Sequence, residues 1–600
     1  MKYTVVCVGK LKERFWKDAC AEYTKRLGAY AKVDMREVAD IDPAKAGGVD
    51  AARNKEGAAI LAALPSRAHV ILLAIEGKER WSEEFSARLD DLMLRGNSDI
   101  AFVIGGSDGV SDDVRARATK FVHAASHAFN NTVTHVSFAG KALLSKEICR
   151  IVTESGMLID TCSMGEMRIA LAAGVPGRRL VLHGNNKSDA EIELAIEQGF
   201  NKIVVDEPGE PERIATIAKR LGKRARVMLR VTSGIHAGGH EFVSTAHEDQ
   251  KFGVALLPAR ADAGKLAVLD DLTDVTPAGS NARLGENASS ADGSDHSAHA
   301  ERKLQYDVKY PYDLSHEKVS EGDRKLAEAM TMVADGPALA VLKDIYRRQD
   351  VLELVGVHSH IGSNIHDADA FIQAAKRMML LRKTFYATDA YTLPEVDLGG
   401  GYSVAYTDGE DSMDIDVELG RLADAVSTVN RALGMPSPVI SFEPGRWTVA
   451  PTGVTLYRVG TVKPVELSGE AKDKSGNPVT ERVYVSVDGG MSDNIRPALY
   501  GSDYTARLAN RKGNKQTKLC RVVGMHCESG DIVVNEVRLP ADIKRGDILA
   551  VPVTGAYGRT MASNYNQALI PAVVGVGEAG AHVMIRRQTI DDLLSWDVSE

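Results

Sequence analysis

The feature that most constrains the fold is a repeated alternation of short apolar strands with amphipathic helical segments. Seven or eight such units follow one another between residues 134 and 442. The predicted strands include residues 134–139, 180–183, 202–205, 226–231, 354–359, 395–398 and 439–442. Because a strand reaches a parallel neighbour through a helix, this alternation predicts a (β/α)8 barrel within an α/β protein.

Two other regions flank the predicted barrel, which we place at residues 116–445. Residues 1–115 contain three predicted strands with helices between them, which is typical of a small, incomplete α/β domain. Beyond residue 446 strands follow one another without helices, so residues 446–600 are predicted to form a β-domain. Inside the barrel, residues 274–302 are rich in Ala, Gly, Ser, Asn and Asp, and we expect a disordered surface insertion there.

Composition excludes several classes of protein. The 73 Lys and Arg against 82 Asp and Glu give a net charge of −9, which offers no general attraction to nucleic acid or anionic membranes. Six cysteines show no CxxC pair or Cys/His cluster, so neither disulfides nor a metal site is expected. No apolar run approaches the roughly 20 residues that span a bilayer, and no secretory signal is present. The simplest location is the cytoplasm, with no membrane partner.

A lysine ends the first predicted barrel strand. The carboxyl ends of barrel strands are where catalytic groups lie, and Lys141 follows residues 134–139 directly. A lysine among apolar neighbours can have a lowered pKa and form a Schiff base with an aldehyde cofactor. The alternative is an ordinary solvated surface charge.

Three further segments follow predicted strands. The triplet Gly399, Gly400 and Gly401 lets backbone N–H groups approach a phosphate, or forms only a tight turn. Glu443 can keep a pyridine nitrogen protonated, or close a turn through an ion pair. His360 and Ser363 offer a flat ring and a hydroxyl, or are ordinary barrel residues.

Together with residues 183–188, 240–253, 486–500, 527–531 and 554–557, these segments resemble the pyridoxal-phosphate (PLP) decarboxylases of the alanine-racemase-like fold family. Within that family they resemble the diaminopimelate decarboxylases. The resemblance extends from about residue 113 to residue 600. It implies PLP as cofactor and the conversion of meso-2,6-diaminopimelate to L-lysine and CO2, the last step of lysine biosynthesis.

The resemblance also implies residue roles. Lys141 would form the Schiff base, and Cys527 would donate a proton from the partner subunit of a head-to-tail homodimer with shared active sites. The cofactor would be held by His360 against the ring, by Glu443 at the ring nitrogen, and elsewhere by Ser363, Gly399, Gly400, Gly401, Gly445, Arg446 and Tyr557. The distal head of the substrate would be bound by Arg446, Arg496, Tyr500, Glu528 and Tyr557.

The residue types suit these roles. Arginines bind carboxylates through two parallel hydrogen bonds, which favours diaminopimelate over ornithine, whose distal end is only an amine. Glu528 and Asp531 lie close to Cys527 in the sequence, and their negative charge should favour the neutral thiol that a general acid needs. The alternative is that Cys527 is a small core residue.

The first 115 residues resemble a second family, the SPOUT-fold methyltransferases of pseudouridine N3 in large-subunit ribosomal RNA. Residues 8–12, 92–96 and 98–109 carry this resemblance. It implies a knotted domain that binds S-adenosylmethionine (SAM) around Leu73, Gly105, Gly106 and Gly109. Family members continue with a Pro-His loop and a helix that passes through the knot, and no such segment follows Asp113. SAM and the ribosome are therefore ligands of this region only if it functions without that segment.

The decarboxylase-like part also lacks an N-terminal strand that its family gives to the β-domain. We interpret the chain as an in-frame join of two truncated genes or an assembly artefact; the alternative is an evolved bifunctional fusion. Three functions follow: an active decarboxylase, an RNA methyltransferase, or a non-catalytic protein that folds partly or serves only as a binding module. The complete set of catalytic positions favours the decarboxylase.

Overall fold

A computed structural model describes residues 2–8, 14–28, 31–39, 59, 63, 69–73, 99–104, 113–129, 134–235, 250–275, 320–577 and 580–598. The chain divides into two compact units, the first of residues 1–112 and 574–583 and the second of residues 113–573 and 584–600. Most of the insertion predicted at residues 274–302 lies outside the described residues. The sequence also predicts a helix at residues 83–94, and that segment lies outside the described residues too.

The first unit is an α/β structure, as predicted. Its sheet has the order β2-β1-β4-β3 with all pairs parallel. The elements are β1 (Lys2–Val8), α1 (Arg14–Leu27), β2 (Lys32–Val38), β3 (His69–Leu73) and β4 (Asp99–Ile104). The sequence did not predict β2. It is an edge strand in which charged residues interrupt the apolar pattern, so the local signal for a strand is weak.

The second unit contains a closed barrel of eight parallel strands, which confirms the predicted fold class. Their order is β5-β6-β7-β8-β9-β11-β12-β13, with β13 paired back to β5. The strands are β5 (Thr134–Ala139), β6 (Leu158–Thr161), β7 (Leu180–Leu182), β8 (Lys202–Val205), β9 (Ala225–Thr232), β11 (Leu352–His358), β12 (Glu395–Asp397) and β13 (Val439–Phe442), and β10 (Val254–Ala255) adds to β9.

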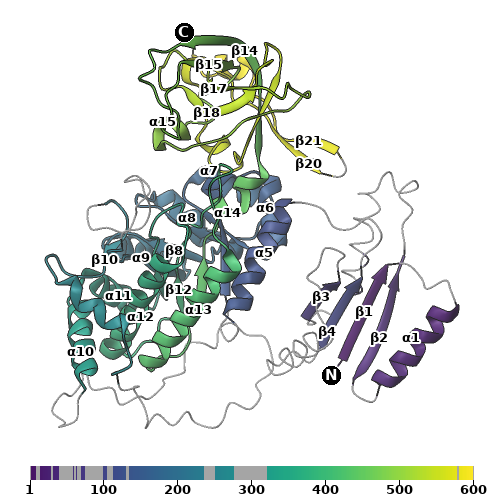
Figure 1. Ribbon diagram of the computed structural model, residues 1–600. Coiled ribbons are helices and arrows are strands. Elements are labelled where there is room, and N and C mark those ends of the chain that lie inside the picture. Colours follow the sequence, from purple (N-terminus) through teal and green to yellow (C-terminus); the bar gives the residue numbers. More distant parts are fainter. Residues whose placement is uncertain are drawn as a thin grey trace. The chain divides into compact units, whose positions relative to one another are not determined.

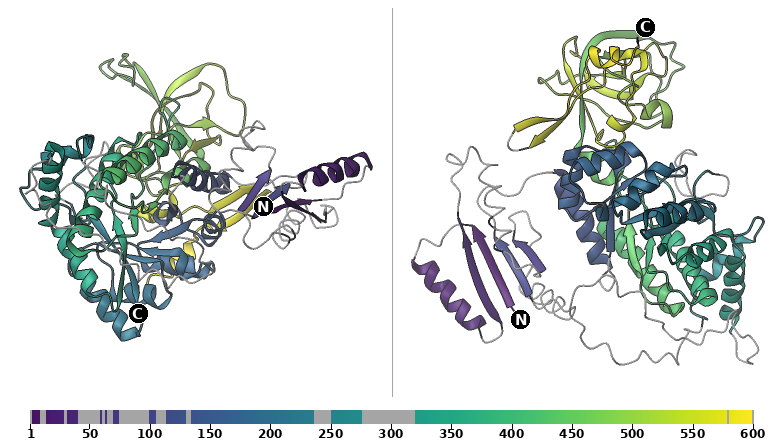
Figure 2. Two further views of the ribbon diagram at one scale, coloured as in Figure 1. Left: turned by 90° about the horizontal axis from the view of Figure 1, so that it is seen from below. Right: turned by 180° about the vertical axis from the view of Figure 1, so that it is seen from behind.

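Helices surround these strands, as Figures 1 and 2 show. They are α5 (Asp113–Ala128), α6 (Lys146–Glu154), α7 (Met164–Ala172), α8 (Asp189–Glu197), α9 (Glu210–Leu221), α10 (Glu321–Ala334), α11 (Pro337–Arg347), α12 (Asp369–Asp389) and α13 (Ile415–Ala432), with short 3-10 turns η1 (Gly140–Ala142), η2 (Gly177–Arg179) and η4 (Ala263–Asp270). Serines begin several of them. Ser145, Ser163 and Ser188 each accept a backbone N–H of the first turn, which ends the preceding loop and starts the helix.

Helix α5 belongs to the barrel although it lies next to the join. Phe121 is fully buried, and its ring centroid lies 5.0 Å from that of Tyr402, 6.0 Å from that of Phe442 and 5.5 Å from that of Trp447. This aromatic cluster fixes α5 against the end of β13 and against the segments that follow β12 and β13.

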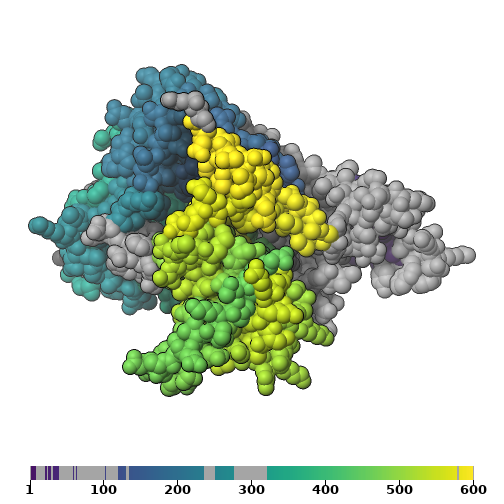
Figure 3. Space-filling model, turned by 90° about the horizontal axis from the view of Figure 1, so that it is seen from above, coloured from purple at the N-terminus to yellow at the C-terminus, as the bar shows by residue number. Residues whose placement is uncertain are grey.

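The C-terminal part of the second unit is a six-stranded sheet of order β16-β19-β14-β15-β17-β18. Its strands are β14 (Val454–Glu466), β15 (Glu481–Val487), β16 (Arg507–Leu508), β17 (Thr517–Val523), β18 (Ile532–Pro540) and β19 (Ile548–Pro552). The strands β20 (Val573–Gly577) and β21 (Gly580–Ile585) form a separate two-stranded sheet, most of which is grouped with the first unit. Figure 3 shows this green-to-yellow region in front of the blue and teal barrel.

The expectation of strands without helices was wrong. Helices α14 (Arg446–Val449), α15 (Arg496–Tyr500) and α16 (Ile590–Leu594) occur in this part, with 3-10 turns η6 (Ala450–Thr452), η7 (Arg559–Met561) and η8 (Tyr565–Gln567). Each is five residues or shorter, too short to show a helical period in the sequence. Among the described residues, no helix is both long and apolar enough to cross a bilayer.

Candidate active site

The carboxyl ends of the eight parallel strands all open at one end of the barrel, which we call the C-terminal mouth. Lys141 follows β5 in the turn η1, and His360 follows β11. The glycine triplet at residues 399–401 follows β12, and Glu443 follows β13. The barrel therefore brings together four segments of the chain, the most distant of which, at Lys141 and Glu443, are 302 residues apart.

Glu443 lies buried between two histidines. Its Oε1 is 3.1 Å from Nε2 of His183 and 3.2 Å from Nε2 of His358. The same Nε2 of His183 is 3.6 Å from Oδ1 of Asp160. All three groups around Glu443 come from strand ends, so closure of the barrel assembles the cluster.

The charges of this cluster follow from its geometry. Burial alone would raise the pKa of Glu443, but His358 and His183 hold it well below its usual value. Burial alone would lower the pKa of His183, but Glu443 and Asp160 raise it to about 9. Near neutral pH the site therefore contains an anionic Glu443 beside a protonated His183.

The glycine triplet is closely packed and has an unusual backbone. Gly399 and Gly401 have φ angles of +70° and +121°, which favour glycine. A Cβ on Gly400 would lie 2.1 Å from the carbonyl oxygen of Glu443. The N–H of Gly399 donates to Oδ1 of Asp397 at 3.0 Å, and the N–H of Gly400 donates to Nδ1 of His360 at 3.1 Å. These two amides thus orient neighbouring side chains.

His360 is uncharged in this arrangement. Burial, followed by the charges of Lys141 and Arg230, holds the pKa of His360 well below its usual value. A neutral ring can accept the Gly400 N–H at Nδ1, which agrees with the hydrogen bond observed there.

Lys141 itself is exposed at the mouth, although Gly140 and Ala142 on either side of it are buried. The reason is its place, because η1 begins where β5 leaves the packed barrel. The next residue, Ala142, accepts a hydrogen bond at 2.8 Å from the backbone N–H of Tyr557, which joins the C-terminal sheet region to this turn.

Arg446 contacts two of the other predicted residues, Ser363 and Tyr557. It is buried, and its Nη2 donates to Oγ of Ser363 at 2.8 Å. Its guanidinium carbon lies 4.8 Å from the ring centroid of Tyr557. Its Nη1 donates to the hydroxyl of Tyr406.

Arg496 lies beside the same tyrosine. Its guanidinium carbon is 4.6 Å from the ring centroid of Tyr406, and its Nη1 donates to the hydroxyl of Tyr504 at 2.5 Å. Tyr406 therefore contacts both arginines and holds two positive charges near each other. Tyr500, at the end of the same short helix α15, is half-buried.

Cys527 and Glu528 are exposed in the turn between β17 and β18. Glu528 accepts a hydrogen bond at 2.7 Å from the hydroxyl of Tyr565. Asp531 is buried and accepts the backbone N–H groups of Met491 and His526, so its carboxylate fixes the turn. Within the described part of the chain, no hydrogen bond or ion pair joins Cys527 or Glu528 to Lys141 or Glu443.

Several residues at the mouth received no role from the sequence. They are Asp160, His183, Arg230, His358, Tyr406 and Tyr504. For Asp160, His183 and His358 a signal existed, because each lies at or just after a barrel strand. The two tyrosines lie in loops, where no pattern marks them.

In the first unit, Leu73 is the last residue of β3. The other residues predicted to contact SAM, Gly105, Gly106 and Gly109, lie outside the described residues.

Comparison with known families matches both halves of the chain. The family "Predicted SPOUT methyltransferase" matches residues 1–140. The family "Pyridoxal-dependent decarboxylase, pyridoxal binding domain" matches residues 113–287 and 332–450. Both families thus cover residues 113–140, which α5 and β5 incorporate into the barrel.

Relatives of known function match the larger part. The chain is 38% identical over 488 residues to a diaminopimelate decarboxylase of Corynebacterium efficiens, a match covering 81% of this chain and 86% of that protein. It is 37% identical to that of Mycobacterium tuberculosis, with coverages of 81% and 89%. The diaminopimelate decarboxylase of Bacillus subtilis is 32% identical over 485 residues, with the same coverages.

Solved structures agree in fold. The diaminopimelate decarboxylase of Helicobacter pylori, complexed with L-lysine, superposes with a TM-score of 0.58 at 25% identity, covering 80% of this chain and 94% of that one. The M. jannaschii enzyme, also in complex with L-lysine, gives a TM-score of 0.60 at 23% identity, with coverages of 81% and 90%.

Proposed function

The chain belongs to the diaminopimelate decarboxylase family, and we propose that it converts meso-2,6-diaminopimelate into L-lysine and CO2 with PLP as its cofactor, the last step of lysine biosynthesis. One observation of the site carries the proposal. The mouth of the barrel holds a lysine at the end of β5 together with the buried, anionic Glu443 at the end of β13.

The residues at the mouth fit PLP. Glu443 Oε1 and His183 Nε2 are buried polar atoms without a well-aligned hydrogen-bond partner among the described residues, and the triplet at residues 399–401 presents no side chains. Lys141 would hold the aldehyde carbon, Glu443 the ring nitrogen, and Ser363, Gly401 and Tyr557 the phosphate. His183, His358 and Glu443 are also close enough to surround a metal ion. In our proposal the protonated ring nitrogen of PLP, and not a metal cation, supplies the positive charge beside Glu443.

When bound, PLP provides an electron sink for the electron pair released as the carboxylate leaves as CO2. The chain supplies the surrounding control. Glu443 keeps a proton at the ring nitrogen, and its own negative charge is stabilised by the two histidines. The neutral ring of His360, oriented by the Gly400 N–H, would pack against the cofactor.

The two arginines at Tyr406 give the substrate preference. A guanidinium binds a carboxylate through parallel hydrogen bonds, and diaminopimelate carries a carboxylate at its distal end whereas ornithine and lysine do not. Arg446 and Arg496 are both buried and held by tyrosine hydroxyls, so their charges are preorganised for such a group.

We further propose a homodimer that shares its active sites. Cys527 is exposed and makes no hydrogen bond with the mouth of its own barrel among the described residues. In a dimer, Cys527 of the partner subunit would approach the mouth and transfer its proton to the carbon that has lost the carboxylate. Neighbouring Met525 is 52% exposed, which suits a surface that a second subunit covers.

The test is release of lysine and CO2 from meso-diaminopimelate by the purified chain with added PLP. Lys141→Ala is the control, because it keeps the fold and removes the amine. Lysine formation that depends on Lys141 would support the proposal. If the protein binds PLP but decarboxylates ornithine instead, the assignment of diaminopimelate as the substrate would be refuted.

For the first unit we infer that methyltransferase activity is lost, because the segment that completes the knotted SAM domain in that family does not follow Asp113. Radiolabelled SAM and ribosomal subunits test this inference. Transfer of the methyl group to ribosomal RNA would contradict it.

A further inference from the structure

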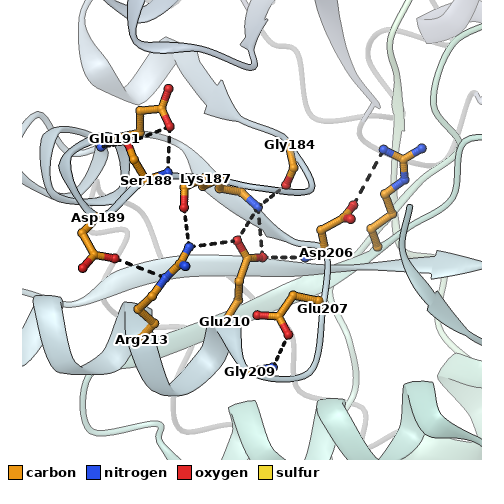
Figure 4. A network of polar contacts seen from close by, with 11 residues as sticks. Gly184, Lys187, Ser188, Asp189, Glu191, Asp206, Glu207, Gly209, Glu210 and Arg213 are labelled. Atoms are coloured by element: carbon orange, nitrogen blue, oxygen red, sulfur yellow. Dashed lines mark hydrogen bonds and ion pairs between the residues drawn. The ribbon is translucent and has the colours of Figure 1, made fainter. Parts of the chain in front are cut away.

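A buried ion pair lies beside the active site but outside it. Figure 4 shows Lys187 pointing toward Glu210, with side chains that are only 1% and 2% exposed. Nζ of Lys187 lies 2.8 and 3.0 Å from the two carboxylate oxygens of Glu210, and it donates to the carbonyl oxygen of Gly184 at 2.6 Å. The ammonium group thus has three acceptors, its full donor capacity.

The pair joins two loops at the C-terminal mouth. Lys187 lies in the loop from β7 to α8, and Glu210 is the first residue of α9, after β8. Glu210 Oε2 also accepts the backbone N–H of Asp206 at 2.7 Å. From α9, Arg213 donates to the carbonyl oxygen of Lys187 at 2.5 Å. These contacts fasten the start of one loop to the other (Figure 4).

Each loop begins with a residue that faces the active site. The first begins with His183, whose Nε2 lies 3.1 Å from Glu443. The second begins with Asp206, whose Oδ1 lies 3.9 Å from Nη1 of the buried Arg230. A shift of either loop would therefore move a charge that faces the cofactor position.

We propose that Lys187 and Glu210 are positioning residues whose ion pair holds the two loops so that His183 faces Glu443 and Asp206 faces Arg230. The proposal rests on the proposed function, in which Glu443 serves the cofactor nitrogen. A buried ion pair is usually no more stabilising than an apolar pair of similar size, so stability alone gives little reason for burying two charges here. The need to fix the geometry of the two loops does give a reason for burying them.

The test separates position from stability. Lys187→Met removes the closest cation and leaves the buried Glu210 carboxylate with Arg213, whose Nη2 is 3.7 Å from Oε1. Lys187→Met/Glu210→Gln removes both charges of the pair and should recover most of the melting temperature. Glu210→Gln is the milder single change, since its amide oxygen can still accept the Asp206 N–H. Because a displacement of about 1 Å can cost 100-fold in rate, we expect kcat to stay about 100-fold low in the double variant.

A second measurement does not depend on turnover. In the unliganded protein, NMR of ¹⁵N-labelled histidine, assigned with His183→Gln, should show the His183 pKa falling from about 9 toward its ordinary value in Lys187→Met. The matched control is Arg220→Met/Glu193→Gln. That pair joins the same helices, α8 and α9, at 3.0 Å, but its side chains are 57% and 32% exposed. It should change neither kcat nor the His183 pKa.

Wild-type kcat in the double variant, or an unchanged His183 pKa in Lys187→Met, would overturn the proposal. An inactive wild-type protein would instead count against the proposed function. The histidine titration would still decide whether the ion pair positions His183.

Discussion

The substitution Gly400→Ala tests the site through a single methyl group. Gly400 does not have the left-handed backbone of its neighbours Gly399 and Gly401, so the change tests space and not backbone strain. The new Cβ would lie 2.1 Å from the carbonyl oxygen of Glu443, whereas non-bonded atoms need about 3 Å or more. The backbone that carries Glu443 must therefore move by about 1 Å.

The expected cost follows from that displacement. Forcing an extra methyl group into a packed region destabilises a protein by about 1–3 kcal/mol. A displacement of about 1 Å at a catalytic group can reduce the rate about 100-fold, which corresponds to about 2.7 kcal/mol in the activation free energy. We expect Gly400→Ala to fold, to bind PLP more weakly, and to form lysine about 100-fold more slowly.

The assay combines lysine formation from meso-diaminopimelate with a titration of PLP absorbance and a melting curve. Gly409→Ala is the matched control, because a Cβ there would meet no atom within 4 Å. Full turnover and unchanged PLP affinity in Gly400→Ala would show that the backbone of Glu443 does not need this position, and the assignment of Glu443 would lose its support.

Three further predictions concern charge, substrate and assembly. The folded pKa of His183, about 9, lies above its unfolded value, so its stabilising contribution is complete below about pH 6.5 and is lost as the pH rises through 9. The free energy of unfolding of the unliganded protein, measured with urea, should therefore be up to about 3 kcal/mol lower at pH 10 than at pH 6. A His183→Gln variant whose unfolding free energy falls equally between these pH values would contradict this. Arg496→Met should raise KM for diaminopimelate at least about 10-fold while PLP affinity is unchanged, and an unaltered KM would exclude Arg496 from substrate binding. Lys141→Ala and Cys527→Ala should each be nearly inactive alone but regain about a quarter of wild-type turnover when mixed and reassembled, since about half of the dimers then contain one intact site. No recovery, with mixed dimers demonstrated, would refute the shared active site.

The sequence by itself determined the fold class and the positions of the main groups. Alternating strands and helices leave a periodic pattern of apolar residues that can be recognised within a short stretch of sequence. The carboxyl ends of the parallel strands of a barrel all lie at one mouth. Lys141, Gly399 and Glu443 each follow such a strand directly, so their convergence could be predicted without coordinates. The failures were local. The edge strand β2 is interrupted by charges, and the helices α14 and α15 are too short to show a period.

Only the tertiary structure decided which side chains meet. That two histidines share Glu443, that Tyr406 lies beside both Arg446 and Arg496, and that Lys187 pairs with Glu210 depends on loops from different strands folding over one mouth. These partners are separated by 23 to 260 residues in the chain. Local sequence propensities carry no information about contacts between residues so far apart. The physical reason is that such contacts form only after the barrel has closed. Burial then decides which polar groups must find partners, and closure decides which partners lie within reach.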